Sequence, residues 1–342
     1  MKKSKPTFID LFSGAGGFLR GFMDAGFEPI FSVEKWEAAI KTHELNYPQV
    51  KLLDKDIREI DNDFLKQYKN MDVDVIIGGP PCQGFSTIGK RLVKDPRNEL
   101  VFEFIRFVRI IQPKMFIMEN VKGLLSLKKG EISESIKEEF EKVGYKSVKY
   151  KVLCAADYGV PQLRHRVFFI GIRKDIKFDE IDFPNPIISN KNSYETVGKA
   201  IMDLVGIENK VPNHVPMNHK EIVRERMKYI PEGGGLPQNE IPDELKYGAR
   251  SDFKDSEVKN FSHVYKRLHR QLPATTMVPG HNAFPLHPVE NRSLTVREAA
   301  RIQTFPDDVI FEGNRQNQCI QVGNAVPVKL SYELAMHFKK YL

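Results

Sequence analysis

The stretch Thr7-Phe8-Ile9-Asp10-Leu11-Phe12-Ser13-Gly14-Ala15-Gly16-Gly17 decides the fold of this chain. Residues 7–12 are typical of a β-strand, residues 13–17 form a glycine-rich turn, and residues 18–24 favour a helix. This order of strand, turn and helix is the nucleoside- or phosphate-binding opening of a doubly wound α/β fold. The turn lacks the strict G-x-G-x-x-G spacing and therefore does not specifically indicate a dinucleotide.

The strand-like runs that follow this opening also end in polar or reactive residues. These runs and the residues after them are 29–33 with Glu34, 50–53 with Asp54 and Asp56, 73–77 with Cys82, and 114–118 with Glu119. Glu34 follows Gly16 by 18 residues, close to the spacing at which such folds place an acid on ribose hydroxyls. Ligands of open α/β sheets bind beyond the carboxyl ends of the strands. One acid there would usually be a cap or a solvated side chain, but five positions in register, counting Phe12, favour a shared site.

The remaining pattern completes the predicted sheet. An amphipathic helix is expected over about 99–111, with Leu100 and Phe104 on its apolar face. Two more strands are expected at 148–153 and 166–172. The alternation of strands and helices predicts an α/β protein with a doubly wound, mostly parallel sheet and helices on both sides.

Cys82 lies in the stretch Gly78-Gly79-Pro80-Pro81-Cys82-Gln83-Gly84-Phe85-Ser86, directly after a β-branched run. The glycines allow a tight turn, and the prolines fix φ and remove two amide donors. A stiff segment of this kind would present one thiol in a fixed position. The alternative is an inert buried thiol, since free cysteines are commonly buried.

Two arginines, Arg164 and Arg166, stand where the chain enters the last predicted strand. Gln162, Arg164 and Arg166 are expected to enter that strand and to share one of its faces, because alternate residues of a strand point the same way. Two guanidinium groups near Cys82 would favour its thiolate and could bind a carbonyl or phosphate. The alternative is a solvated arginine pair at the end of a strand.

Composition sets outer limits on function. The 342 residues are 41% hydrophobic and 28% charged, as in ordinary globular proteins, and the net charge of +7 permits a polyanionic partner without requiring one. The three cysteines form neither a C-x-x-C pair nor a Cys/His cluster, so we expect no metal site and no disulfide framework. We expect neither a signal peptide nor a membrane span, and a cytoplasmic location.

The C-terminal half is less regular. Residues from about 174 to 270 are rich in proline and lack periodicity, which predicts a smaller, loop-rich domain. An excursion without function is the alternative, although long irregular segments of compact enzymes are usually functional. Regularity returns where Thr295 and Glu298 predict a capping box, and a last helix is expected at 329–341.

Together these motifs resemble the DNA (cytosine-5)-methyltransferase family of the bacterial restriction–modification type. The motifs, in the family's order, are Asp10–Phe18, Gly79–Ser86, Glu119–Val121, Gln162–Arg166, Asn291–Glu298 and Gly323–Pro327. The resemblance implies a class I, Rossmann-like fold dependent on S-adenosylmethionine. It also implies a cofactor-binding catalytic domain of residues 1–180 and 290–342, and a target-recognition (DNA-binding) domain of residues 181–289.

The resemblance further implies a reaction, in which a methyl group passes from S-adenosylmethionine to C5 of a flipped-out cytosine in a short, specific duplex sequence. Cys82 would add to C6 and make C5 reactive, which is covalent catalysis. Glu119 would protonate or hydrogen-bond N3 and therefore needs a raised pKa. Arg166 would contact O2 and hold Glu119, while Arg164 would support the pocket. S-adenosylhomocysteine would be the product, and no metal is implied.

The resemblance assigns cofactor contacts residue by residue. They are Phe12 on the adenine face, Glu34 on the ribose hydroxyls, Asp56 and Ile57 at the adenine edge, Gly14, Gly17 and Leu100 at the methionine end, and Pro80, Asn324 and Val326 around them. The family often has an aromatic residue directly after the acid. Here Lys35 stands between them, and Trp36 is left out of the predicted site.

Double-stranded DNA is the partner that the resemblance implies. The basic segment 84–98 is expected to close over DNA, with contacts from Ser86, Lys90, Arg91 and Arg97, and Thr275 or Thr276 is expected to face the groove. A cognate restriction endonuclease is a further functional partner that the resemblance suggests. We expect a monomer and no membrane association.

Three other functions were weighed against this one. A transfer-RNA cytosine-5 methyltransferase of the same family would carry a Cys-Phe-Thr tripeptide, which is absent. A non-catalytic, DNA-binding regulatory module with the same fold would not need Cys82, Glu119 and both arginines. An amino-methyltransferase would place an acid or amide before Pro-Pro and an aromatic after it, where this chain has Gly79 and Cys82.

Overall fold

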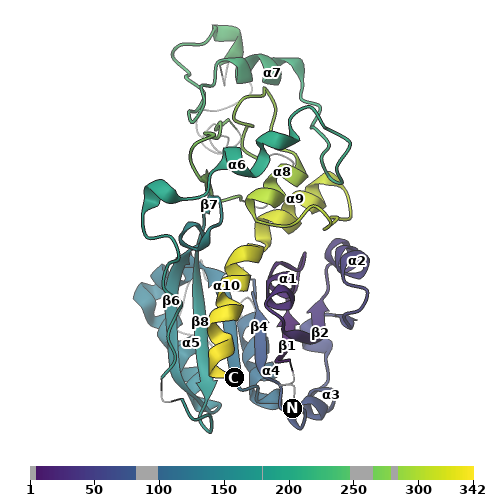
Figure 1. The fold of residues 1–342 in the computed structure, drawn as a ribbon, viewed down its shortest axis with the longest axis vertical. Helices are drawn as coiled ribbons and strands as arrows, with labels where there is room; N and C mark the ends of the chain where they lie inside the picture. Colours follow the sequence, from purple (N-terminus) through teal and green to yellow (C-terminus); the bar gives the residue numbers. More distant parts are fainter. Residues whose placement is uncertain (1–4, 82–98, 179, 247–264, 279–283) are drawn as a thin grey trace.

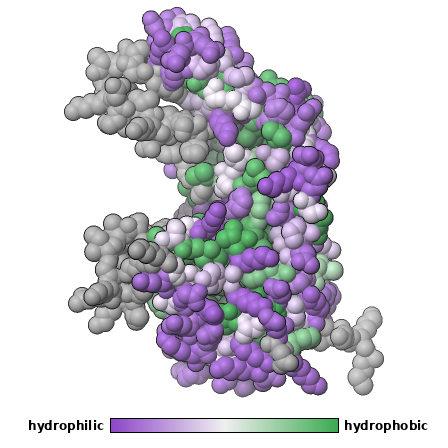
Figure 2. Space-filling view, turned by 90° about the vertical axis from the view of Figure 1, so that its left-hand side faces the viewer, coloured by the Kyte–Doolittle hydropathy of each residue, from purple (hydrophilic) through white to green (hydrophobic). Residues whose placement is uncertain are grey.

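The structure is a computed structural model that describes residues 5–81, 99–178, 180–246, 265–278 and 284–342. The molecule is elongated, with a lower lobe that contains the main sheet and an upper lobe of short helices and loops (Figure 1). Seen from the side, it is hollowed between the two lobes (Figure 2). In the described part of the chain, no helix is long and apolar enough to cross a membrane.

The bounds of the elements follow the predicted alternation closely. The strands of the main sheet are β1 (Thr7–Leu11), β2 (Glu28–Glu34), β3 (Leu52–Asp54), β4 (Val75–Gly78), β5 (Met115–Val121), β6 (Tyr145–Cys154) and β8 (His165–Arg173). The helices are α1 (Gly17–Asp24), α2 (Glu37–Asn46), α3 (Asn62–Lys69), α4 (Glu99–Ile111), α5 (Glu131–Lys142), α6 (Val197–Ile201), α7 (Glu221–Lys228), α8 (Val296–Ile302), α9 (Arg315–Asn324) and α10 (Val328–Phe338). A separate small sheet pairs β7 (Gln162–Leu163) with β9 (Ala274–Thr275).

The main sheet has the strand order β3-β2-β1-β4-β5-β8-β6. Its first five strands are parallel, and β8 runs antiparallel to both β5 and β6. The order reverses between β1 and β4, which pair Leu11 with Gly78 at their carboxyl ends. A reversal of this kind opens a crevice at the edge where ligands bind. The predicted doubly wound, mostly parallel sheet is therefore confirmed.

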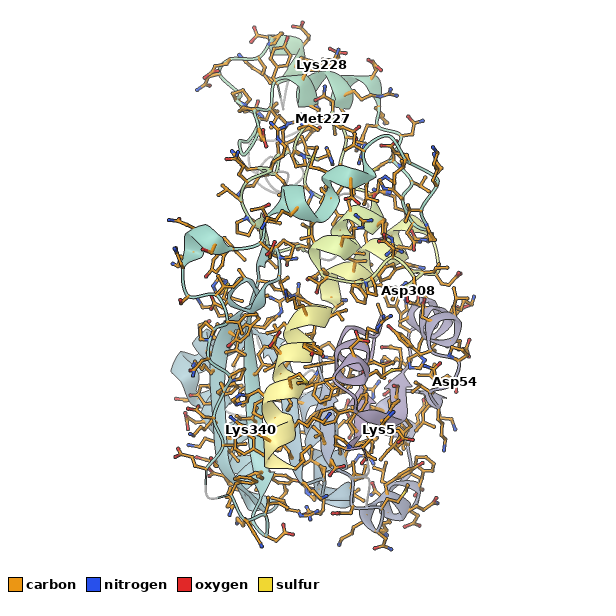
Figure 3. The ribbon with its side chains drawn as sticks, viewed as in Figure 1. Lys5, Asp54, Met227, Lys228, Asp308 and Lys340 are labelled. Carbon is orange, nitrogen blue, oxygen red and sulfur yellow. The ribbon has the colours of Figure 1, made fainter. Side chains whose placement is uncertain are left out.

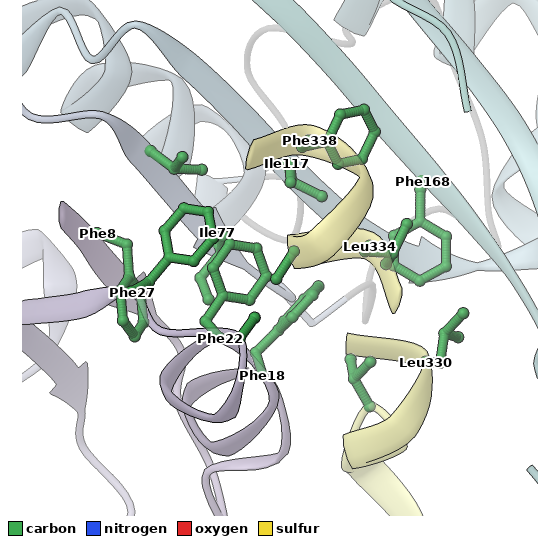
Figure 4. Close-up of a cluster of buried hydrophobic side chains, with 14 of the residues drawn as sticks. Phe8, Phe18, Phe22, Phe27, Ile77, Ile117, Phe168, Leu330, Leu334 and Phe338 are labelled. Atoms are coloured by element: carbon green, nitrogen blue, oxygen red, sulfur yellow. The ribbon is translucent and has the colours of Figure 1, made fainter. Parts of the chain in front are cut away.

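Helices cover both faces of this sheet because its central strands are apolar on both sides. On one face, Phe8, Ile77 and Phe168 pack beneath α1 and α10 (Figure 4). On the other, Ile9 and Ile76 belong to the cluster formed with α3, α4 and α5. Full burial of such side chains contributes about 1.5–3 kcal/mol each, which makes this two-sided core the main source of stability in the lower lobe.

The upper lobe shares its apolar core with the C-terminal helices. One cluster joins residues of the upper lobe to residues between Leu294 and Val328, and it reaches Ala15 in the turn after β1; the upper-lobe members are Val197, Ile201, Leu268, Ala274, Met277 and Phe284. The predicted capping box begins α8, with Thr295 and Glu298 bonded reciprocally. From there α10 descends onto the sheet (Figure 1). Because residues 294–328 pack against both lobes, the domain limits at 181 and 289 stay a prediction.

Buried arginines supply donors to carbonyls that regular structure does not satisfy. The carbonyls bound are those of Met227, Ile230, His287 and Glu290 for Arg267, and those of Pro212, Pro306 and Val309 for Arg297. A buried carbonyl without a donor costs free energy, so these side chains stabilise the irregular backbone. A basic residue in this lobe is thus not by itself a nucleic-acid contact.

The two lobes also meet beside α2. Asn46 of α2 accepts the Ile310 amide at 2.8 Å and donates to the Ile310 carbonyl at 2.7 Å. Arg20 of α1 pairs with Asp308 at 3.3 Å, and Asp308 lies close to α2 (Figure 3). These contacts place residues 308–310 against α1 and α2 of the lower lobe.

Substitution of Phe22 tests how much the packing between α1, the sheet and α10 stabilises the fold. It is fully buried and its ring lies 5.0 Å from that of Phe27 and 5.3 Å from that of Phe8. We expect Phe22→Ala to lower the free energy of unfolding by about 3–5 kcal/mol, measured by urea unfolding followed by circular dichroism. The control is Leu45→Ala on α2, where the side chain is 49% exposed and the expected change is within about 0.5 kcal/mol. Equal effects of the two changes would contradict this account of the core.

Candidate functional site

A cavity of about 450 Å³ lies at the carboxyl edge of the parallel strands. Its wall includes every residue predicted to contact the cofactor, namely Phe12, Gly14, Gly17, Glu34, Asp56, Ile57, Pro80, Leu100, Asn324 and Val326. Two of the predicted catalytic residues, Glu119 and Arg166, line the same cavity. Residues from eight parts of the chain thus meet in one space of the size that small-molecule sites occupy.

The glycine-rich turn forms one wall through its backbone. Phe12 and Gly14 both have left-handed backbone conformations, with φ of 60° and 53°, which turn the chain sharply after β1. Gly17 begins α1 so close to the C-terminal segment that a Cβ there would lie 2.1 Å from the Val326 carbonyl oxygen. Only glycine permits that approach, so the sequence of the turn fixes where Val326 lies in the wall.

Glu34 is held by the backbone at the end of β2. Its Oε2 accepts the Gly14 amide at 2.8 Å, and its Oε1 accepts the amides of Lys35 and Trp36, each at 2.8 Å. An ionised carboxylate offers about four lone-pair positions. One therefore remains for a hydroxyl group of a ligand, and the three amides orient it.

Asp56 forms ion pairs with two basic side chains. Its carboxylate pairs with Lys35 at 2.9 Å and with Arg58 at 2.6 Å, and hydrogen bonds from Arg58 lower its pKa. Arg58 also pairs with Glu99 at the start of α4. Lys35 is 53% exposed, and exposed ion pairs of this kind contribute about 0–1 kcal/mol. A ligand amine could therefore replace Lys35 at little cost.

Asp10 is a second carboxyl group in the wall, and it is almost completely buried. Neither of its oxygens has a hydrogen-bond partner among the described residues. Burial raises the pKa of Asp10 well above its usual range, and the nearby Glu34 raises it further. The Leu19 amide opposes both effects weakly, since it does not meet hydrogen-bond geometry with either oxygen. A buried carboxyl without a partner is costly, and a cationic ligand in the cavity would offset that cost.

Glu119 and Arg166 form an ion pair in the wall of the same cavity. Arg166 Nε lies 2.9 Å from Glu119 Oε1, and both side chains are nearly buried. Burial raises the pKa of Glu119, while Arg166 and Arg164 partly counteract the rise. A Cβ at Gly79 would lie 3.1 Å from Glu119 Oε2, so glycine there leaves space for the carboxyl group. This carboxyl can hold a proton that an ordinary glutamate would lose.

Arg164 lies behind this pair and does not line the cavity. Its guanidinium donates to the carbonyls of Gly323 at 2.9 Å and Asn324 at 3.2 Å, and burial lowers its pKa to about 9. The prediction that Gln162, Arg164 and Arg166 share one face of a single strand is wrong. Gln162 belongs to β7 and β8 begins only at residue 165, because the chain bends where Arg164 turns inward to the end of α9.

The remaining predicted residues fall into two groups. Cys82, Ser86, Lys90, Arg91 and Arg97 lie outside the described residues. Thr275 and Thr276 are half-buried, and the Thr276 hydroxyl donates to the Leu163 carbonyl at 2.9 Å. Their expected contacts with DNA stay a prediction.

Asp10, Trp36 and Asn120 line the cavity and were missed at the sequence level. Trp36 lines the cavity although the aromatic was excluded for standing one position too far from Glu34. The backbone amides of Lys35 and Trp36 both donate hydrogen bonds to Glu34 Oε1, and these bonds turn the chain after β2 toward the cavity. Asn120 also lines the cavity, and its side-chain amide donates to the Pro80 carbonyl at 3.0 Å. It thereby holds the segment that leads to Cys82.

The chain is similar in sequence to one family of known proteins. The family model for C-5 cytosine-specific DNA methylase matches residues 6–340. The chain is 43% identical to the type II methyltransferase M1.HphI of Haemophilus parahaemolyticus, over 96% of this chain and 85% of that protein. It is 39% identical to the type II methyltransferase M.DdeI of Desulfomicrobium norvegicum, over 98% of this chain and 89% of that protein.

Solved structures share the fold. A protein described as a candidate DNA modification methyltransferase of an E. coli prophage superposes with a TM-score of 0.78 at 27% identity, covering 98% of this chain and 99% of that one. The sheet order and flanking helices are those of class I S-adenosylmethionine-dependent methyltransferases. Among the residues that the structure describes, no group of three or more His, Cys, Asp or Glu could hold a metal ion.

The raised pKa of Asp10 has a consequence for stability. An acid whose pKa is higher in the folded state stabilises the fold at low pH and loses that contribution as pH rises from its ordinary value of 3.8 through the folded value. We expect Asp10→Asn to be more stable than the wild type by a margin that grows with pH, by at most about 1.4 kcal/mol per pH unit. Urea unfolding of the ligand-free protein between pH 4 and pH 8 measures it. A margin that stays constant or shrinks with rising pH would contradict the assignment.

Proposed function

The chain belongs to the C-5 cytosine-specific DNA methylase family, and from that premise we propose that it methylates C5 of a flipped-out cytosine with S-adenosylmethionine through a covalent bond between Cys82 and C6. It is a DNA (cytosine-5-)-methyltransferase of the type II restriction–modification kind, with DNA as its substrate. The observation that supports the proposal best is a single cavity in which the Glu119–Arg166 pair faces the same space as Glu34 and Asp10.

The residues of this cavity fit S-adenosylmethionine. The molecule carries a sulfonium and an ammonium group, and the unpartnered Asp10 carboxyl in the wall would suit a cation. Ribose hydroxyls would suit the free lone pair on Glu34, which three backbone amides orient. Phe12 and Trp36 supply aromatic surface to the wall, as a purine requires.

We propose distinct roles for the residues around the cofactor. Glu34 binds the ribose, Phe12 and Trp36 contact the adenine, and the backbone of Gly14 and Gly17 approaches the methionine end. When bound, the cofactor supplies an electrophilic methyl group. Asn324 and Val326 close the cavity from the C-terminal side, where the Gly17 contact holds them. Asp56 would reach the adenine edge by exchanging its ion pair with Lys35.

Glu119 acts on the pyrimidine ring in this proposal. Addition of a thiolate at C6 places negative charge on the ring, and a proton or hydrogen bond at N3 stabilises it. Burial favours the protonated carboxyl that can donate there, and Arg166 stabilises the carboxylate that remains after donation. Burial thus favours the protonated acid, and the two arginines favour the carboxylate, so each form has a stabilising partner in the site.

Cys82 is the proposed nucleophile. Its sulfur forms a bond to C6, the C5–C6 double-bond electrons become available at C5, and N3 takes the proton from Glu119. C5 would then gain the methyl group of the cofactor, with S-adenosylhomocysteine as the leaving group. A base removes the C5 proton, the C6–S bond breaks, the thiolate leaves, and N3 returns its proton to Glu119. Asn120 fixes the Pro80 carbonyl two residues before Cys82, which limits where the sulfur can lie.

The substrate would be duplex DNA with the target cytosine turned out of the stack, since C6 is not accessible inside a base pair. We propose Ser86, Lys90, Arg91 and Arg97 as DNA contacts in the basic segment, and the loop with Thr275 and Thr276 as part of sequence recognition. A cognate restriction endonuclease as a functional partner and a monomeric state belong to the same proposal.

Methylation in cells tests the activity directly. Plasmid DNA from cells that express the protein should contain 5-methylcytosine in one short motif, detected by bisulfite sequencing and by mass spectrometry of hydrolysed nucleosides. DNA from cells with the empty vector is the control. Unmethylated DNA from cells in which the folded protein accumulates would refute the proposed reaction.

The nucleophile has a separate test. Cys82→Ser should lower turnover by at least about a thousandfold, because a serine hydroxyl is ionised far less than a thiol near neutral pH. Calorimetry should find its affinity for S-adenosylhomocysteine unchanged. Cys154→Ser is the matched control, since Cys154 is half-buried and does not line the cavity. Substantial activity of Cys82→Ser would rule out the covalent route.

A further inference from the structure

A chain of buried amide groups runs from the upper lobe to the wall of the cavity. The Met277 amide donates to Gln162 Oε1 at 3.2 Å, and Gln162 Nε2 donates to Gln303 Oε1 at 3.1 Å. Gln303 Nε2 then donates to the carbonyls of Val322 at 2.8 Å and Ala325 at 3.4 Å. Met277, Gln162 and Gln303 are all fully buried.

The direction of this chain is fixed by its ends. A backbone amide can only donate, so the carbonyl oxygen of Gln162 must face Met277. A backbone carbonyl can only accept, so the amino group of Gln303 must face Val322. Each glutamine is therefore held in one of its two possible orientations.

The far end of the chain completes the last turn of α9. The final carbonyls of a helix have no partner within the helix. Here Gln303 binds those of Val322 and Ala325, and Arg164 binds those of Gly323 and Asn324. Two side chains from outside the helix thus hold four consecutive carbonyls, and they fix the segment that carries Asn324 and Val326 into the cavity wall.

The near end holds the loop to which DNA recognition is assigned. β9 pairs Ala274 with Gln162 and Thr275 with Leu163, and Thr276 donates to the Leu163 carbonyl. With the Met277 bond to Gln162, four successive residues of this loop are tied to residues 162–163. Movement of the loop would therefore strain the same glutamine that contacts Gln303.

We infer that Gln162 and Gln303 are positioning residues that tie the loop 274–277 to the cofactor wall, so that a filled cavity orders this loop for DNA. The inference rests on the proposed function, since it takes the occupant of the cavity to be the cofactor. A ligand that contacts Asn324 and Val326 restricts the carbonyls of the last α9 turn. The buried chain extends that restriction to the loop, without requiring a change of shape.

Hydrogen exchange measured by mass spectrometry tests the coupling in the intact protein. Saturating S-adenosylhomocysteine should slow exchange of the amides in 274–277 by about fivefold or more, the lower end of typical coupling between sites. In Gln303→Met, the ligand should still bind by calorimetry but slow exchange by less than about twofold. Gln162→Met removes a different link of the chain, should behave in the same way, and provides the test if Gln303→Met does not fold.

Gln112→Met is the matched control. Gln112 donates two hydrogen bonds to backbone carbonyls, those of Arg109 and Val143, at the opposite edge of the sheet. The chemical change is therefore the same, but the hydrogen-bond chain through Gln162 and Gln303 stays intact. In Gln112→Met, S-adenosylhomocysteine should slow exchange of the amides in 274–277 as much as in the wild type. Bound ligand without slowing in the wild type, or full slowing in Gln303→Met or Gln162→Met, would overturn the inference. Failure of the wild type to bind the ligand would instead contradict the cofactor assignment on which it rests.

Discussion

The close approach of the first and last helices is the constraint on which the rest of this structure depends. A Cβ at Gly17 would lie 2.1 Å from the Val326 carbonyl, and one at Gly21 would lie 2.5 Å from Ser331. Glycine at both positions lets α1 contact the chain on either side of Pro327 backbone to backbone. The C-terminal segment can then form a wall of the cavity that the N-terminal turn begins, and α10 can cover the sheet.

The cavity wall contains carboxyl groups, among them those of Asp10, Glu34 and Glu119, whose ionised forms water would stabilise in an unfolded chain. Glu34 accepts hydrogen bonds from three amides, and Glu119 is charge-paired with one guanidinium at 2.9 Å. Asp10 has neither an ion pair nor a hydrogen-bond partner among the described residues. Burying a carboxylate without compensation is expensive, so the fold carries a cost at Asp10. Such a cost is typical of sites whose partner is a ligand, because the ligand supplies the missing charge. The raised pKa of Glu119 has the same origin in burial, and Arg166 and Arg164 limit the rise.

The upper lobe achieves order with little regular secondary structure. Its backbone carbonyls are bound by Arg267 and Arg297, and the Met277 amide is bound by Gln162. Buried polar groups of this kind specify one arrangement because every partner must be present at once. This rigidity explains how a loop-rich segment could present a defined surface to DNA.

Much of the fold and of the site was predictable from local patterns. Periodicity and glycine turns located the strands, and the rule that ligands bind at strand ends gathered Phe12, Glu34, Asp56 and Glu119 correctly around one cavity. Cys82 lies outside the described residues, so its place in the site is still a prediction from the motif. The order of the motifs also identified the family, because each motif occupies a fixed place along the chain.

The sequence by itself determined the order of the elements, the residue types at the strand ends and the family. Only the tertiary structure decided that Trp36 curls back into the cavity, that Arg164 binds the end of α9, and that Asp10 is without a hydrogen-bond partner. Gln162 and Gln303 meet across 141 positions of sequence. Local periodicity describes neighbours within one helix or strand, whereas these contacts arise when distant segments pack and buried polar groups must find partners.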